Sequence, residues 1–236
     1  MTTSLHGSTE QETAAVHLPL GQAEYRATHD LQLRLHALRS QGVIPDTILS
    51  VEHDPVFTIG RRGSRTNLLV GKDTLEREGI AVYEVERGGD ITYHGPGQVV
   101  LYPIVDLRDH GKDIGGYVRG LEQAVIGVLA RLGVEADRRP GLPGVWVKER
   151  KIAAIGVHVR KWVTLHGLAL NVRANREHFA MINPCGMKIE AVSLDDLVER
   201  RYSLAEVISN LLEAMETLFG WRVVEEEPER FLKERG

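Results

Sequence analysis

The sequence predicts an α+β fold, with a mixed, largely antiparallel sheet and flanking helices. Short β-branched and apolar runs follow one another closely along the chain, and few of them are separated by a helix as strands in βαβ units would be. Three longer segments instead repeat their apolar residues at helical spacing. At 236 residues, the chain is long enough to bury a large core without disulfides or metal ions.

The three predicted helices are bounded by residues that favour helix ends. The first is expected between Gly21 and Gly42, and the second ends before Gly133. The third runs from a capping box at Ser203 to residue 219. Short β-branched, apolar and alternating runs predict strands at residues 47–52, 56–59, 80–86, 98–107, 145–148, 151–159 and 165–172. The fifth and sixth of these strands are expected to form a hairpin.

Both ends of the chain are expected to lie outside the main core. Residues 1–20 show little apolar pattern, so they are predicted to be a mobile N-terminal extension. The charged residues from 225 onward are expected to form a short appendage, with a helix at 229–234. No Gly/Ser linker divides residues 21–236, which predicts a single domain; the alternative is a small C-terminal subdomain from about residue 182.

Composition excludes several classes of protein. The net charge of −4, with acidic and basic residues interspersed, argues against a nucleic-acid partner. No apolar run approaches the ~18 residues of a membrane helix, and the first residues lack the pattern of a signal peptide. One cysteine permits no intrachain disulfide, and zinc-type Cys/His spacings are absent. We therefore expect a cytoplasmic protein with no membrane contact, metal or cofactor.

The only cysteine, Cys185, stands between Pro184 and Gly186, which favours a shaped loop that presents the thiol. A lone cysteine is more often a small buried apolar residue, which is the alternative. With a pKa of ~8.5, a free thiol is only a few per cent thiolate at neutral pH, so a nucleophilic role needs an activating group. Lys151, at the head of an apolar strand, is one candidate, although such lysines are usually solvated strand ends. The rival candidates are His94, His158 and His166.

The segment from Arg87 to Gln98 contains four glycines and one proline between two predicted strands. Glycines let backbone N–H groups and neighbouring side chains approach a ligand, so this segment predicts a binding loop. The alternative is a long structural hairpin connection. The spacing of a phosphate-binding P-loop is absent.

Four segments of the chain resemble, in order and spacing, the signature blocks of the lipoyl(octanoyl) transferases. These segments are Arg87–Gln98, Lys151–Gly156, His166–Asn171 and Asn183–Gly186. The resemblance implies the α+β fold of the biotin and lipoate protein ligases. It also implies an enzyme that moves an octanoyl group from acyl carrier protein to a lysine of a lipoyl domain, the first step of protein lipoylation. The implied acceptors are the lipoyl domains of 2-oxoacid dehydrogenase complexes and the glycine cleavage H protein.

The resemblance assigns the acyl-thioester nucleophile to Cys185, and to Lys151 the group that lowers the thiol pKa. Lys151 could also act as an acid or base. Small residues near these strands, at Ala153, Ala154, Gly156 and Gly167, could leave an apolar slot for the acyl chain. The implied substrate-binding residues are Arg87, Gly88, Gly89, Asp90, Ile91, Thr92, Tyr93, His94, Ala154, Ile155, Gly156, Gly167, Leu168 and Ala169. The arginines that could steer acidic carrier proteins are Arg61, Arg62, Arg65, Arg138 and Arg139.

Two rival functions fit parts of this pattern. An ATP-dependent lipoate ligase of the same fold would activate free lipoate as an adenylate and would need no nucleophilic cysteine. A binding module without catalytic activity would hold a carrier protein or lipoyl domain without forming an acyl adduct. ATP dependence separates the first rival from an acyltransferase, and intact-protein mass spectrometry separates the second.

Overall fold

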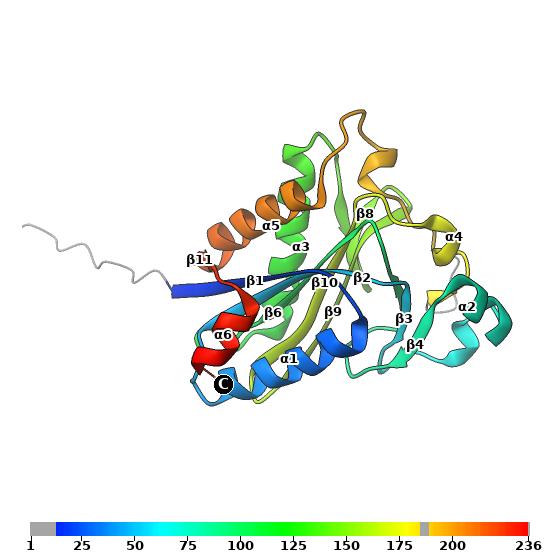
Figure 1. Cartoon of the computed structure of the whole chain (residues 1–236). Helices are drawn as coiled ribbons and strands as arrows, with labels where there is room; N and C mark the ends of the chain where they lie inside the picture. Colours follow the sequence, from blue (N-terminus) through cyan, green and yellow to red (C-terminus); the bar gives the residue numbers. More distant parts are fainter. Residues whose placement is uncertain (1–12, 185–188, 236) are drawn as a thin grey trace, which may run out of the picture.

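The computed structural model describes residues 13–184 and 189–235. Its main sheet contains β1 (Thr13–Ala23), β2 (Asp46–His53), β6 (Gln98–Ile104), β7 (Asp137–Arg139), β8 (Leu142–Val147), β9 (Arg150–Arg160), β10 (Val163–Asn171) and β11 (Trp221–Glu225). The strand order is β11-β1-β2-β6-β10-β9-β8-β7 (Figure 1). Only the pairs that β1 makes with β2 and β11 are parallel; the other pairs in this sheet are antiparallel. The predicted α+β class, with a mixed, largely antiparallel sheet, is confirmed.

A smaller sheet packs beside the main one. It has the order β4-β3-β5, formed by β4 (Ala81–Glu84), β3 (Val56–Ile59) and β5 (Ile91–His94). Its apolar side chains, such as Phe57 and Tyr93, form a separate buried cluster with Ile182. The predicted binding loop therefore includes a strand, β5, and is anchored on this second sheet.

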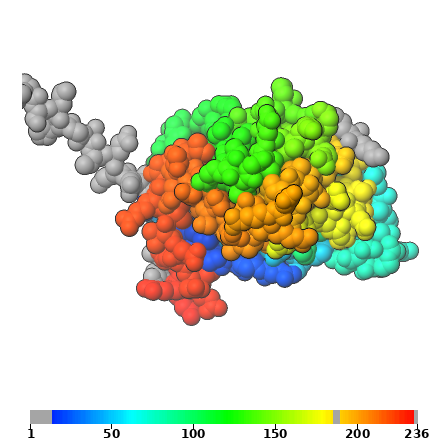
Figure 2. All heavy atoms as spheres, turned by 90° about the horizontal axis from the view of Figure 1, so that it is seen from above, coloured from blue at the N-terminus to red at the C-terminus, as the bar shows by residue number. Residues whose placement is uncertain are grey.

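Helices cover both faces of the main sheet. The helices are α1 (Tyr25–Ser40), α2 (Lys72–Glu78), α3 (Ile114–Arg131), α4 (Arg176–Phe179), α5 (Leu204–Phe219) and α6 (Pro228–Arg235). Residues of α3 and α5 pack with one set of strand residues, and residues of α1 and α6 pack with the alternate set. Figure 2 shows α3, in green, and α5, in orange, side by side on one face. The two faces of the sheet are thus buried against different helices.

The ends of α5 follow from local chemistry. The Ser203 side chain accepts from the backbone N–H of Glu206, and the Glu206 carboxylate accepts from the Ser203 backbone N–H, which completes the predicted capping box. Gly220 ends the helix in the left-handed conformation, with φ of 67°. The helices expected before Gly42 and Gly133 are also present.

For residues 13–20, the prediction of a mobile extension is wrong. These residues form most of β1, which lies inside the sheet between β2 and β11. The strand contains a buried histidine, His17, whose ring nitrogens lie 2.8 Å from Ser50 Oγ and 3.0 Å from Glu225 Oε2. Its partners come from distant parts of the chain, so local sequence gives little sign of the pairing. Residues 1–12 lie outside the described residues.

The C-terminal residues share the cores of the rest of the chain. Met215 of α5 and Trp221 of β11 are buried with α3, and Phe231 of α6 is buried on the opposite face. Residues 189–235 therefore belong to the same folded unit as the strands before them. Within the described residues, no helix is long and apolar enough to cross a membrane.

Candidate active site

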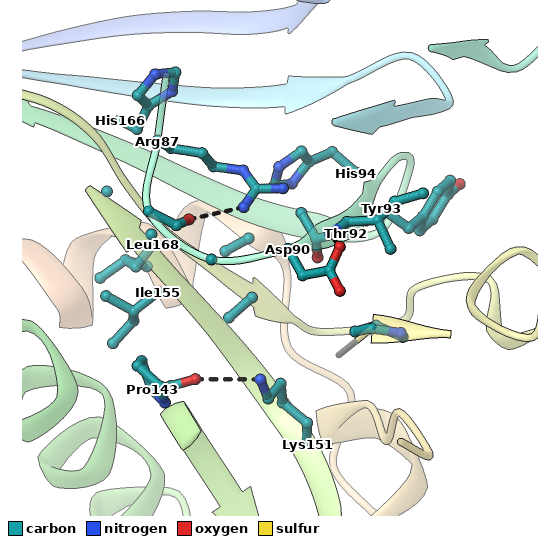
Figure 3. A pocket seen from close by; sticks show the side chains of 18 of the residues that line it. Arg87, Asp90, Thr92, Tyr93, His94, Pro143, Lys151, Ile155, His166 and Leu168 are labelled. Atoms are coloured by element: carbon teal, nitrogen blue, oxygen red, sulfur yellow. Dashed lines mark hydrogen bonds between the residues drawn. The ribbon is translucent and has the colours of Figure 1, made fainter. Parts of the chain in front are cut away.

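A cavity of about 450 Å³ lies between the loop and strand of residues 87–94 and the β9–β10 hairpin (Figure 3). The structure places every predicted substrate-binding residue, and also Lys151, on its wall. The volume falls within the range of ordinary small-ligand pockets, about 300–1,000 Å³. The cavity thus brings together residues of all four motif segments, which lie far apart in the sequence; Pro184 is the lining residue of the fourth.

The floor of the cavity is made by small residues in register. Across the β9–β10 pair, Ala154 is opposite Ala169, and Gly156 is opposite Gly167. A Cβ on Gly156 would lie 3.0 Å from the carbonyl oxygen of Gly88, so this glycine lets the binding loop approach the sheet closely. Opposed small side chains leave room above the hairpin for an extended apolar group.

Two of the small residues predicted to form the slot serve packing, one of them in addition to lining the cavity and the other instead of it. A Cβ on Gly167 would lie 2.2 Å from the carbonyl oxygen of Leu101, so this glycine permits close contact with β6 as well as lining the cavity. Ala153 is fully buried in the core that faces α3 and is not among the cavity-lining residues. The prediction that Ala153 contributes to the slot is therefore wrong, because side chains alternate along β9.

Arg87 is buried and serves to hold the loop. Its guanidinium donates to the Thr58 hydroxyl from Nε (3.1 Å) and Nη2 (2.9 Å), to the Thr58 carbonyl (2.6 Å) and to the Gly88 carbonyl (2.9 Å). Burial lowers the pKa of Arg87 to about 10, so the side chain stays charged at neutral pH. These bonds fix the start of the loop against β3.

Asp90 and Tyr93 tie the same loop to the segment that precedes Cys185. Asp90 Oδ2 accepts from the side-chain amide of Asn67 at 2.6 Å, and the backbone carbonyl of Asn67 accepts from the N–H of Asn183 at 2.8 Å. The Tyr93 hydroxyl lies 2.8 Å from Nδ1 of His178. The loop and the residues around 181–183 are thus positioned by shared neighbours.

Lys151 lies at the opposite end of the cavity from Arg87 (Figure 3). Its Nζ donates to the Pro143 carbonyl at 3.1 Å and lies 4.7 Å from the centre of the Trp146 ring. A carbonyl oxygen and the face of an aromatic ring both stabilise a charged ammonium. The Lys151 end of the cavity therefore carries an ammonium beside the apolar slot, and the Arg87 guanidinium lies at the other end.

The backbone of Lys151 is held by the chain that follows residue 188. Its N–H donates to the carbonyl of Glu190 at 2.9 Å, and its carbonyl accepts from the N–H of Val192 at 3.0 Å. Pro184 and Ile189, the described residues on either side of 185–188, both line the cavity. Cys185 itself lies outside the described residues.

The three rival histidines occupy different places. His94 and His166 line the cavity, whereas His158 does not. His94 is buried, which places its pKa well below 6.5, and its Nδ1 donates to Gln98 Oε1 at 3.3 Å. A neutral histidine of this kind cannot supply a positive charge to a thiolate.

Several cavity residues were missed by sequence reasoning. Gln98 donates to Asn171 Oδ1 at 2.9 Å, and Asn171 donates to the Val192 carbonyl at 3.1 Å. Both side chains end segments that carry the family resemblance, so a signal for them was present. Tyr25, Tyr102 and Pro143 also line the cavity, but their places depend on the packing of α1, β6 and β8.

Comparison with known proteins places this cavity in context. A model of the lipoyl protein ligase A/B catalytic domain matches residues 24–216. The chain is 53% identical to the octanoyltransferase of Solibacter usitatus over 188 residues, which cover 80% of this chain and 85% of that protein. It is 47% identical to the octanoyltransferase of Syntrophobacter fumaroxidans over 203 residues, or 86% and 89% of the two chains. The fold is similar to that of a bi-partite lipoate protein ligase from Thermoplasma acidophilum, with a TM-score of 0.70, 20% identity and coverage of 94% and 91%.

Proposed function

Because the chain belongs to the lipoyl protein ligase A/B catalytic domain family and its curated relatives are octanoyltransferases, we propose that it transfers octanoyl from acyl carrier protein to a lipoyl-domain lysine through a thioester on Cys185. Octanoyl transfer in the lipoylation pathway follows from those relatives. The donor, the intermediate and the acceptor form the proposal. The observation that carries it is the small-residue cavity, which has the Lys151 ammonium at one end and is also lined by Pro184 and Ile189, the residues that flank 185–188.

In the first half-reaction, the Cys185 thiolate attacks the carbonyl carbon of the octanoyl thioester. A new carbon–sulfur bond forms, the bond to the phosphopantetheine sulfur breaks, and that sulfur leaves with the electron pair and takes up a proton. An ammonium about 4 Å from a thiolate contributes up to about 4 kcal/mol at an effective dielectric near 20, before desolvation is subtracted. Lys151 is the group that we assign to this stabilisation.

In the second half-reaction, the neutral amine of the acceptor lysine attacks the acyl-Cys185 carbonyl. The amide forms, the Cys185 thiolate leaves, and the proton of the amine passes to a base. No ATP is consumed, because an amide is more stable than the thioester that it replaces. The contacts of Lys151 with Pro143 and Trp146 favour its charged form, which supports the role of thiolate partner over that of base.

The direct test is intact-protein mass spectrometry after mixing the chain with octanoyl-acyl carrier protein. We expect one adduct of the octanoyl mass that hydroxylamine removes, and no such adduct on Cys185→Ser. Product formation that requires ATP would favour a ligase, and a wild-type chain without an adduct would favour a binding module. A Lys151→Arg variant with unchanged rates in the acceptor half-reaction would exclude the role of Lys151 as base.

Recognition of acidic carrier proteins is assigned to two of the five predicted arginines. Arg61 and Arg62 are exposed beside the binding loop, and Arg62 lines the cavity. The other three already pair within the chain: Arg65 with Glu84, Arg138 with Glu122, and Arg139 with Glu149.

Charge reversal tests this assignment. We expect Arg61→Glu/Arg62→Glu to slow adduct formation most strongly at low salt, where steering is least screened. Arg222→Glu is the matched control. Arg222 is an exposed arginine on β11, the edge strand that β1, β2 and β6 separate from the β9–β10 hairpin of the cavity. Equal rates for the double variant, the control and the wild type would remove these two arginines from carrier recognition. We expect the enzyme to meet acyl carrier protein and the lipoyl domain in the cytoplasm.

A further inference from the structure

Three potential metal ligands from separate elements meet at the Arg87 end of the cavity. His29 comes from α1, Glu86 from the loop after β4, and His166 from β10. Glu86 Oε1 lies 3.1 Å from His29 Nε2 and 3.5 Å from His166 Nε2, and one donor atom from each residue lies within 4.8 Å of the others. We propose that this cluster, the His29–Glu86–His166 site, binds a divalent transition-metal ion, with Zn²⁺ as the best match to its donors.

The donor set fits this chemistry. Two imidazole nitrogens and one carboxylate oxygen form a common set of zinc ligands, and they leave a fourth position for water. His166 is only 2% exposed, and its Nε2 has no hydrogen-bond partner among the described residues. This buried ring nitrogen makes no hydrogen bond within the described part of the chain and lies 3.5 Å from the Glu86 carboxylate oxygen, an arrangement that a cation bound between them would satisfy.

Tetrahedral Zn²⁺ binding would need only a small change in the distances between the three donor atoms. Zn²⁺ with ligands at about 2.0–2.1 Å in tetrahedral geometry holds its donor atoms about 3.3 Å apart. The two separations that involve Glu86 already have this length. The His29 and His166 rings are stacked, with centroids 5.5 Å apart and planes at 21°. One ring nitrogen of His29 lies within 4.8 Å of one of His166, and metal binding would require the more exposed His29 side chain to rotate and close this gap.

The charge of a neighbouring residue also affects the affinity of this site for a cation. Arg87 follows in the chain and opposes a cation, and we therefore expect micromolar rather than tighter binding.

A bound ion would connect three parts of the molecule. It would tie α1 and β10 to the loop that begins the binding segment, just before Arg87. His166 also lines the cavity, so the ion would stabilise one end of the cavity wall. This inference does not depend on the proposed acyl transfer.

The experiment is a titration of the untagged full chain with Zn²⁺ by calorimetry. Cys185→Ser serves as the background, because a cysteine thiolate is itself a strong zinc ligand. We expect one ion per chain and a rise in melting temperature. Co²⁺ should give the intense visible absorption of a tetrahedral site.

Variants locate the site. We expect His29→Ala and Glu86→Gln each to weaken binding by at least about tenfold, because each removes one ligand. His36→Ala is the matched control, since His36 is a histidine of the same helix that bonds to the Arg160 carbonyl instead, and it should bind as the background does. His29 is partly exposed and alanine favours helices, so His29→Ala should stay folded.

Three results would overturn the proposal. The first is the absence of saturable Zn²⁺ binding in the background protein. The second is unchanged affinity in a folded His29→Ala variant, and the third is a Co²⁺ spectrum of six-coordinate type. Each can be observed whether or not the chain transfers octanoyl groups.

Discussion

A carboxylate on α3 is predicted to position the amine of Lys151 through the backbone. Glu122 is nearly buried, with a side chain that is 8% exposed. Its Oε1 accepts from the N–H of Gly144 at 3.0 Å, and its Oε2 accepts from Arg138 Nε at 2.9 Å. The carbonyl before Gly144 is that of Pro143, which accepts from Lys151 Nζ. We expect Glu122→Gln to disturb this chain of contacts.

The expected loss of unfolding free energy follows from the number of hydrogen-bond acceptors that each side chain offers. Both bonds of Glu122 need an acceptor, and glutamine has only one side-chain oxygen, so its NH₂ group must face one of the two donors. Loss of a hydrogen bond to a charged group costs about 1.5–3 kcal/mol, so the free energy of unfolding should fall by about 2 kcal/mol. If about 1.4 kcal/mol of that loss also appears in the acylation barrier, adduct formation slows about tenfold.

The assay combines urea unfolding with single-turnover acylation of Cys185, followed by mass spectrometry across a range of pH. Gln123→Ala is the matched control, because Gln123 also accepts from Arg138, at 2.9 Å, whereas the Gly144 N–H donates to Glu122. We expect the control to retain the wild-type acylation rate and pH profile. A folded Glu122→Gln variant whose rate and pH profile equal those of the wild type would refute the positioning role.

Three further predictions concern His53, Ala154 and Thr58. Burial lowers the pKa of His53 to about 4, so the unfolded chain binds a proton first as pH falls below about 6.5. Between pH 6.5 and 4, urea titrations should show the wild type losing up to about 3 kcal/mol more unfolding free energy than His53→Gln; equal losses would contradict this. Ala154→Leu should fill the slot and shift competition between hexanoyl and octanoyl carriers about tenfold toward hexanoyl, since each buried methylene contributes about 0.8 kcal/mol. Unchanged adduct ratios would mean that the acyl chain binds elsewhere. Thr58→Val removes the hydroxyl that accepts from Arg87 and should reduce stability by about 1.5–3 kcal/mol in denaturant, whereas Thr58→Ser keeps the hydroxyl, loses only a buried methyl group, and should be destabilised less.

Local signals predicted much of the architecture. The capping box at Ser203 and the glycine at Gly220 fixed the ends of α5, because both act within a few residues. The β8–β9 hairpin and the loop after Arg87 were also predicted, since short β-branched runs and clustered glycines are readable in short windows. The strand β5 inside that loop was missed, because its pairing with β3 involves residues more than thirty positions away.

In the candidate site too, some features follow from the local sequence and others from the tertiary structure. The sequence by itself determined the helix ends, most strands of the central sheet, and the motif segments whose residues line the cavity, because these depend on neighbours along the chain. Only the tertiary structure decided that β1 lies between β2 and β11, that Pro143 and Trp146 surround the Lys151 amine, and that His29 meets His166. Such contacts join residues far apart in the chain, and their free energies arise only when the strands and helices pack together.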